Sequence, residues 1–143
     1  MNLPVALHHT DTLSFPKMFE LTVETRFAAA HAISIAGTPE PLHGHNWHVT
    51  AQVRGEKLDS DGLVCDFHTV QEMLGEIVSP FHNNNLNTTP PFDRTNPTAE
   101  LLASYIATRL SASLDEALAP HAKVHSVRVT EADGCAATYY MPP

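Results

Sequence analysis

The sequence is poor in cysteine and in positive charge. Its 143 residues include only two cysteines, Cys65 and Cys135, too few for the disulfide framework of a small secreted domain. Lysine and arginine together number 8 against 16 acidic residues, so the formal net charge at pH 7 is −8. Because binding to nucleic acid phosphates needs clustered basic side chains, we expect no nucleic acid partner.

Long apolar runs are also missing. A membrane-spanning helix needs roughly 18 successive apolar residues, and no such run occurs, so we expect no membrane partner. Residues 1–16 contain no basic cluster followed by an apolar run, so we expect no secretory signal and a cytoplasmic protein. We interpret residues 1–16 as a flexible N-terminal arm and residues 17–143 as a single domain.

Alternating apolar and polar residues predict β-strands. Side chains of a strand alternate between the two faces of a sheet, so such a pattern leaves one apolar face for the core. The strands are expected over residues 19–27, 47–54, 124–131 and 136–141. Asp133-Gly134, between the last two, is typical of the tight turn of a β-hairpin.

Apolar residues at helical spacing predict two helices between the second and third strands. The first follows an N-cap at Asp66, and the second is capped by Asn96 with Pro97 at its first position. Segments 36–41 and 81–94 are expected to be loops, because they are rich in Pro, Asn and Thr. The order strand, strand, helix, helix, strand, strand favours an α+β fold, an antiparallel sheet with both helices on one face.

Histidine is the residue that the chain has in excess, with 10 copies. His43-Gly44-His45 enters the second strand, where residues two apart project to the same side, so that two imidazoles can bind one ion. His31, at the end of the first strand, is a candidate third ligand. Three neutral imidazoles and one open position form a known catalytic zinc arrangement. The alternative is that this His-x-His pair arises by chance in a histidine-rich chain.

Glu131 lies on the same predicted strand face as Val127 and Val129. A carboxylate on an apolar face needs a partner, because burying an unpaired charge is costly. A planar ligand with an amidine-like edge would donate two hydrogen bonds to it. The alternative is that Glu131 simply ends its strand in solvent.

Several short segments occur along residues 18–141 in an informative order. They are Phe27-Ala28-Ala29-Ala30-His31, Leu42-His43-Gly44-His45-Asn46, Asp66-Phe67, Leu86-Asn87, Asn96-Pro97-Thr98-Ala99-Glu100 and Val129-Thr130-Glu131. In this order and at these intervals they resemble the family of 6-pyruvoyl-tetrahydropterin synthase and 6-carboxy-tetrahydropterin synthase. The resemblance implies a tunnelling fold, with a four-stranded antiparallel sheet and two helices, assembled into a homo-oligomer, either a trimer or a hexamer.

The resemblance also implies a set of site residues. It places Zn2+ on His31, His43 and His45, and a pterin ring on Glu131. The substrates implied are 7,8-dihydroneopterin triphosphate and close relatives, small molecules bound where subunits meet. The family's usual catalytic cysteine, shortly before the His-Gly-His, is absent from this sequence, and His82 stands in the first position of the family's Asp-His pair.

Glu40, three residues before His43, offers a replacement for the cysteine. A branch of the family uses a glutamate there and cleaves the substrate side chain to 6-hydroxymethyl-7,8-dihydropterin, a folate precursor. We therefore favour this zinc-dependent lyase activity, with Glu40 as general acid/base and His82 as a second catalytic residue. Two alternatives stay open: synthesis of 6-carboxy-tetrahydropterin, the queuosine precursor, and a non-catalytic zinc- and pterin-binding homologue. Either side chain could also be an ordinary loop residue in solvent.

Overall fold

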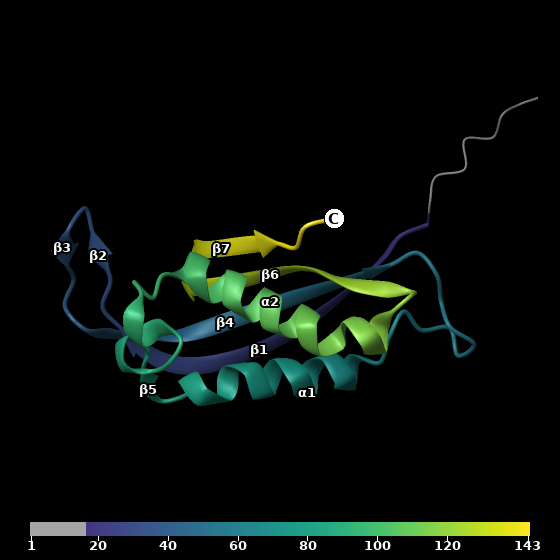
Figure 1. Cartoon of the computed structure of the whole chain (residues 1–143), viewed down its shortest axis with the longest axis horizontal. Helices are drawn as coiled ribbons and strands as arrows, with labels where there is room; N and C mark the ends of the chain where they lie inside the picture. Colours follow the sequence, from purple (N-terminus) through teal and green to yellow (C-terminus); the bar gives the residue numbers. More distant parts are fainter. Residues whose placement is uncertain (1–16) are drawn as a thin grey trace, which may run out of the picture.

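Two long antiparallel strands form the centre of the sheet. The computed structural model describes residues 17–143, so the N-terminal arm expected for residues 1–16 lies outside the described residues. The strands of the main sheet are β1 (Phe19–His31), β4 (His43–Gly55), β5 (Asn84–Asn85), β6 (Ala122–Ala132) and β7 (Cys135–Tyr140). They lie in the order β5-β1-β4-β6-β7 (Figure 1).

The prediction of a four-stranded antiparallel sheet is wrong, because the sheet has five strands and one of the strand pairs is parallel. The short β5 pairs parallel to β1, with Asn84 opposite Ala29. Just before it, the backbone N–H of Asn83 donates to Ala28 O at 2.6 Å. The outer edge of β1 carries backbone groups that need partners, and the loop supplies some of them. A two-residue strand has no periodicity, so no sequence pattern reveals it.

The segments expected to be loops contain further short elements. Within residues 36–41, β3 (Thr38–Pro39) pairs with β2 (Ser34–Ile35) to form a small separate hairpin at one end of the molecule (Figure 1). Its turn residue Gly37 has φ +81°, a conformation that glycine adopts without strain. Three short 3-10 helices, η1 (Ser79–Phe81), η2 (Leu86–Thr88) and η3 (Phe92–Arg94), lie between the two α-helices.

The two predicted helices are present, and one of the two predicted caps is wrong. Helix α1 (Phe67–Val78) begins as expected after Asp66, whose side chain accepts a hydrogen bond from a backbone N–H of the first turn. Helix α2 (Ala99–Leu118) is capped by Thr98, two residues later than expected. Asn96 does not cap α2, because its amide binds the backbone of Ser34, accepting from N and donating to O at 2.8 and 3.0 Å.

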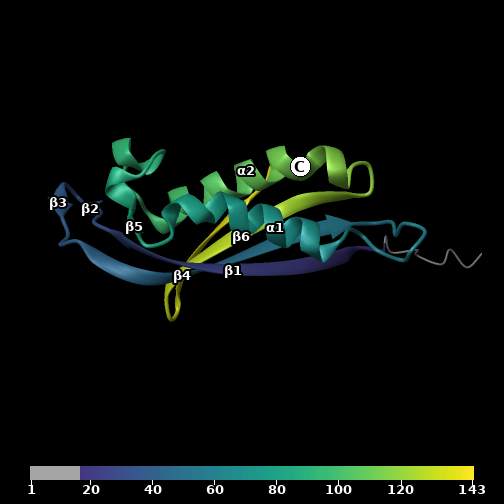
Figure 2. The same cartoon turned by 90° about the horizontal axis from the view of Figure 1, so that it is seen from below.

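Both helices cover the same face of the sheet, as the sequence predicts (Figure 2). The core lies between the two layers and includes the fully buried side chains of Trp47 and Val49 from β4, and of Leu102 and Ile106 from α2. Along β4, buried residues alternate with more exposed ones from Trp47 to Gly55, which confirms the alternation predicted from the sequence. Among residues 17–143, neither α-helix combines the length and the apolar character that a membrane span requires.

Gly55 marks a close approach at the end of β4. A Cβ atom at Gly55 would lie 2.6 Å from the backbone oxygen of His121 and 2.9 Å from the side chain of Val64. We expect Gly55→Ala to lower the free energy of unfolding by about 1–3 kcal/mol in urea denaturation, because backbone must move. The matched control is Gly75→Ala in α1, where nothing lies within 4 Å of the new methyl group and a gain of about 0.5–1 kcal/mol is expected. Equal stability of Gly55→Ala and the wild type would contradict the close approach.

Candidate metal centre

Strand pairing brings the three predicted histidine ligands together. The register of β1 and β4 places His31 directly opposite His43, and His45 lies two residues further along on the same face. The ring centroids of these three imidazoles are 4.8–5.1 Å apart in every pair. His31 is fully buried, so the core holds this side chain in place.

Glu131 completes the cluster from β6. The pairing of β6 with β7 shifts register between Thr130 and Ala132, so Glu131 sits at an irregularity of the kind that redirects a side chain. Its Oε1 atom lies 3.2 Å from His31 Nε2 and 2.9 Å from His45 Nε2. One candidate ligand atom from each of the four residues lies within 4.8 Å of all the others.

Backbone carbonyls determine which ring nitrogens face the cluster. His31 Nδ1 lies 2.8 Å from Pro97 O, and His43 Nδ1 lies 2.8 Å from Pro41 O. A carbonyl oxygen only accepts, so both Nδ1 atoms carry the proton and donate. In the neutral ring the lone pair is then on Nε2. Metal-ligating histidines are oriented in the same way, by donating their other N–H to a carbonyl or carboxylate.

The nitrogen and oxygen atoms of the cluster are suited to bind a cation. His31 Nε2 and Glu131 Oε1 are both acceptors when the imidazole is neutral, so their 3.2 Å separation calls for a positive charge between or beside them. His45 Nε2 is buried and, within residues 17–143, has no hydrogen-bond partner of suitable geometry. A metal ion ligated by these nitrogens would satisfy both. Imidazole and carboxylate ligands suit Zn2+, although the donor set does not specify one metal.

Burial prepares His45 for coordination. Desolvation lowers the pKa of His45 below its ordinary value, and the nearby His31 and His43 rings lower it further, while the Glu131 carboxylate acts in the opposite direction. The net lowering favours the neutral ring, which is the form that binds a metal.

The two predicted catalytic residues lie outside the cluster. Glu40 is half-buried directly after β3, and its backbone N–H donates to Ile33 O at 2.8 Å. His82 is exposed, and its Nδ1 accepts a hydrogen bond of 3.2 Å from the backbone N–H of Ala28. The four residues of the cluster therefore do not include either of them.

Two further residues position the cluster and were not predicted as site residues. Asn87 binds both backbone groups of Ala32, accepting from N at 2.8 Å and donating to O at 2.7 Å, and so holds the residue that follows His31. Pro97 supplies the carbonyl for His31. Both lie in segments that carry the family resemblance, but nothing local in the sequence shows which backbone each of them reaches.

A cavity of about 490 Å³ opens beside the cluster. It is lined by His45 and Asn46 of β4, by the alanines of β1 next to His31, and by residues 83–85. His45 belongs both to the cluster and to the lining of this cavity. The polar amides of residues 83–85 give the cavity hydrogen-bonding groups without charge.

The fold and the cluster together define a class, an α+β domain with a three-histidine, one-glutamate centre at one end of its sheet. The family model described as 6-pyruvoyl tetrahydropterin synthase matches residues 20–142. The chain therefore belongs to that family.

Known proteins resemble the chain in sequence and in structure. The 6-carboxy-5,6,7,8-tetrahydropterin synthase of Bacillus subtilis is 29% identical over 106 residues, which cover 70% of each chain. A putative enzyme of the same name from Archaeoglobus fulgidus is 34% identical over 65 residues, 46% of this chain and 56% of that protein's length.

Solved structures share the fold. The 6-pyruvoyl tetrahydropterin synthase of Caenorhabditis elegans has a TM-score of 0.74 at 20% identity, covering 90% of this chain and 100% of that one. The 6-pyruvoyl tetrahydropterin synthase of Plasmodium vivax has a TM-score of 0.70 at 23% identity, covering 87% of this chain and 98% of that one. These likenesses confirm the α+β fold that the sequence resemblance implies, with the mixed sheet described above.

Proposed function

We propose that the protein is a zinc-dependent pterin enzyme that acts on 7,8-dihydroneopterin triphosphate and releases 6-hydroxymethyl-7,8-dihydropterin. The observation that carries the proposal is the cluster of His31, His43 and His45 with Glu131, whose candidate ligand atoms lie within 4.8 Å of one another. Family membership, which rests on residues 20–142, supports a pterin as the small-molecule substrate.

The three histidines would hold the metal through their Nε2 atoms. Zn2+ bound there would act as a Lewis acid on hydroxyl and carbonyl oxygens of the substrate side chain. Pro97 and Pro41 keep two of the rings oriented through their carbonyl oxygens. The buried position of His31 limits the approach of water on that side.

Glu131 has two possible roles at this centre. As a fourth ligand it would close the coordination shell, which is the arrangement of structural zinc sites. As a substrate anchor it would accept hydrogen bonds from the pterin ring and leave the fourth position open. We favour the anchor, because a quarter of its side chain (26%) is accessible while His31 is inaccessible. That exposure leaves carboxylate surface for a ligand.

Replacement of Glu131 separates these roles. We expect Glu131→Ala to retain zinc but to weaken pterin binding by about 2 kcal/mol or more, because a charge-assisted bidentate contact is lost. Zinc content by mass spectrometry and pterin affinity by fluorescence titration are the two measurements. Loss of zinc would identify Glu131 as a metal ligand, and unchanged pterin affinity would refute the anchor. Exposed Glu72 of α1, replaced by Ala, is the control.

Glu40 is proposed as the general acid/base. It lies three residues before His43, a chain distance of at most about 11 Å, which keeps it close to the metal cluster along the chain. In the 6-pyruvoyl tetrahydropterin synthase of Plasmodium vivax, variants with a glutamate changed to alanine or cysteine are described as catalytic residue mutants, so a glutamate is catalytic in that protein of the same fold.

His82 is proposed as a second proton carrier. Because its Nδ1 accepts a hydrogen bond from Ala28 N, the proton of the neutral ring is on Nε2. Ala28 and residues 83–85 all line the cavity beside His45, so His82 is anchored at the margin of that cavity. Its Nε2–H can therefore serve as a donor to a bound molecule.

Product identification tests the proposed reaction. Zinc-loaded protein is incubated with 7,8-dihydroneopterin triphosphate, and the products are separated and identified by mass spectrometry. The 6-hydroxymethyl product supports the proposal. The carboxy product, which the name of the Bacillus subtilis relative favours, would replace it with 6-carboxy-tetrahydropterin synthesis. Tight binding of unaltered substrate would identify a non-catalytic homologue.

A homo-oligomer, either a trimer or a hexamer, is also proposed. Within residues 17–143, the outer edge of β1 is paired only at Ala29 and Ala30, and β7 has a strand neighbour on one side only. Free edges of this kind favour pairing with a second copy. Light scattering measures the mass directly, and a monomer at micromolar concentration would contradict the assembly.

A further inference from the structure

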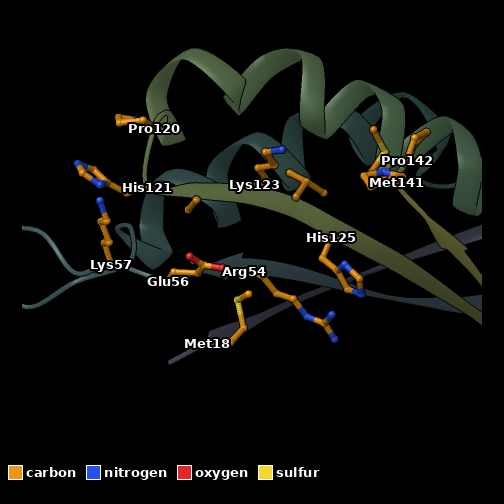
Figure 3. Close-up of a pocket in the computed structure, with 14 residues that line it drawn as sticks. Met18, Arg54, Glu56, Lys57, Pro120, His121, Lys123, His125, Met141 and Pro142 are labelled. Atoms are coloured by element: carbon orange, nitrogen blue, oxygen red, sulfur yellow. The ribbon is translucent and has the colours of Figure 1, made fainter. Parts of the chain in front are cut away.

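A second, larger cavity lies at the other end of the sheet. It has a volume of about 760 Å³ and is bounded by the end of β4, the beginning of β6 and the segment after β7 (Figure 3). Strand β4 runs from His43 at the metal centre to Arg54 at this cavity, a distance of roughly 35 Å along an extended chain. The two sites share no lining residue among those that the structure describes.

Positive charge is concentrated in this cavity. Arg54, Lys57 and Lys123 line it, three of the 8 lysines and arginines of a chain whose net charge is −8. Arg54 is paired with Glu20 at 2.7 Å, whereas neither lysine has a carboxylate within 4.0 Å among residues 17–143. Glu56 is the acidic side chain in the lining. Lys57 and Lys123 are therefore available for an anion.

Strand register brings two of these cationic residues together at the end of the sheet. Arg54 and Lys123 are direct partners across the β4–β6 pair. Like charges in this position are destabilising. The Glu20 carboxylate offsets one of them on the β1 side, and an anion bound in the cavity would offset the other.

Gly55 helps to position Lys57 at the cavity. The missing side chain allows β4 to approach within 2.6 Å, measured from an ideal Cβ position, of the His121 backbone oxygen. This contact joins the chain after β4 to the turn before β6. As a result, the side chains of Lys57 and His121 lie at one end of the cavity with Lys123 further along it (Figure 3).

Apolar walls complete the cavity. Met18, just before β1, lies near Arg54 and Glu56, whereas Met141 and Pro142, after β7, lie at the end away from Lys57 (Figure 3). A volume in the range of small-molecule sites, mostly apolar walls and a few charged groups are common properties of a pocket for an organic ligand.

We propose that this cavity binds a phosphorylated small molecule. Lys57, Lys123 and Arg54 would bind its phosphate groups, and its apolar body would pack against Met18 and Met141. Lysine ammonium groups are common phosphate ligands, and the guanidinium of Arg54 retains donors beyond the one bound to Glu20. The proposal does not depend on the reaction proposed for the metal centre.

Calorimetric titration of the 143-residue protein with ATP tests this proposal. ATP is the probe, and inorganic triphosphate and adenosine are titrated in parallel to separate the contributions of the phosphates and of the ring. We expect saturable ATP binding that is tighter than that of either part alone. In the Lys57→Gln/Lys123→Gln double variant, the dissociation constant for ATP should rise about tenfold or more, because two charge-assisted contacts are lost.

Two control variants make the outcome specific. Arg94→Gln/Arg109→Gln removes the same charge outside the cavity and should bind ATP within twofold of the wild type. His43→Ala should also retain ATP binding, because the metal centre is at the other end of the sheet. Equal ATP affinity in both double variants, or binding that is lost in His43→Ala, would overturn the proposal. Neither result would bear on the zinc-dependent reaction.

Discussion

Glu40→Gln is expected to lower the turnover of 7,8-dihydroneopterin triphosphate by about 10²–10⁴, the usual contribution of a general acid/base. The glutamine amide has nearly the same shape as the carboxylate but cannot take up or release a proton. Zinc content and pterin affinity should stay at the wild-type level, because Glu40 is not part of the metal cluster. Steady-state kinetics with a metal assay on the same sample measures all three quantities.

The control for this variant is Glu76→Gln, on an exposed position of α1, which removes the same charge and should leave turnover unchanged. Full activity of Glu40→Gln would remove Glu40 from the mechanism and make His82 the first alternative. His82 is exposed and bound to Ala28 N through Nδ1, so His82→Asn is the variant to test next.

Loss of zinc from His43→Ala is the second large effect that we expect. Zinc sites of this kind use three protein ligands and one exchangeable position, so removing one imidazole should reduce bound zinc from about one ion per chain to nearly none. Elemental analysis after dialysis measures the content. His68→Ala removes an exposed imidazole, paired with Asp66 at 3.1 Å, and is the control that should keep its zinc. Stoichiometric zinc in His43→Ala would refute the assignment.

A fall in pH should release zinc, as His43→Ala does, because protons compete with the metal for the imidazoles. The metal-free protein should respond as well. The folded state lowers the pKa of His45, so the unfolded chain binds a proton there more readily. This contribution to the free energy of unfolding is present above a pH of about 6.5 and is lost as the pH falls through the lower pKa of the folded state. Replacement of His45 by Asn should flatten that part of the stability curve.

Local sequence patterns predicted much of the fold. Alternation located the long strands, helical spacing located α1 and α2, and Asp133-Gly134 located the β6–β7 turn. Asp66 was correctly placed as a cap, since capping depends on a contact within one turn. Asn96 was not, because its side chain binds Ser34, 62 residues away. A contact with a distant partner leaves no local signal.

For the residues of the cluster too, local sequence patterns predicted the candidates, and contacts between distant segments decided their arrangement. His43 and His45 form a recognisable pair within three residues of sequence, His31 was a candidate third ligand at the end of the first predicted strand, and Glu131 was predicted to bind the substrate. Their meeting depends on long-range pairing, because the β1–β4 register places His31 opposite His43 and an irregularity in β6 carries Glu131. A shift of one residue in either pair would turn these side chains to the opposite face.

By itself the sequence determined the strand and helix segments, the residues able to bind a metal and the acidic balance of the chain. Tertiary structure alone decided the fifth strand, the carbonyl partners that orient His31 and His43, and the basic cavity beside Gly55. The physical reason is that amphipathic periodicity and capping act between near neighbours. The register of the strands, the carbonyl partners of the imidazole rings and the walls of the cavity depend instead on contacts between residues far apart in the chain.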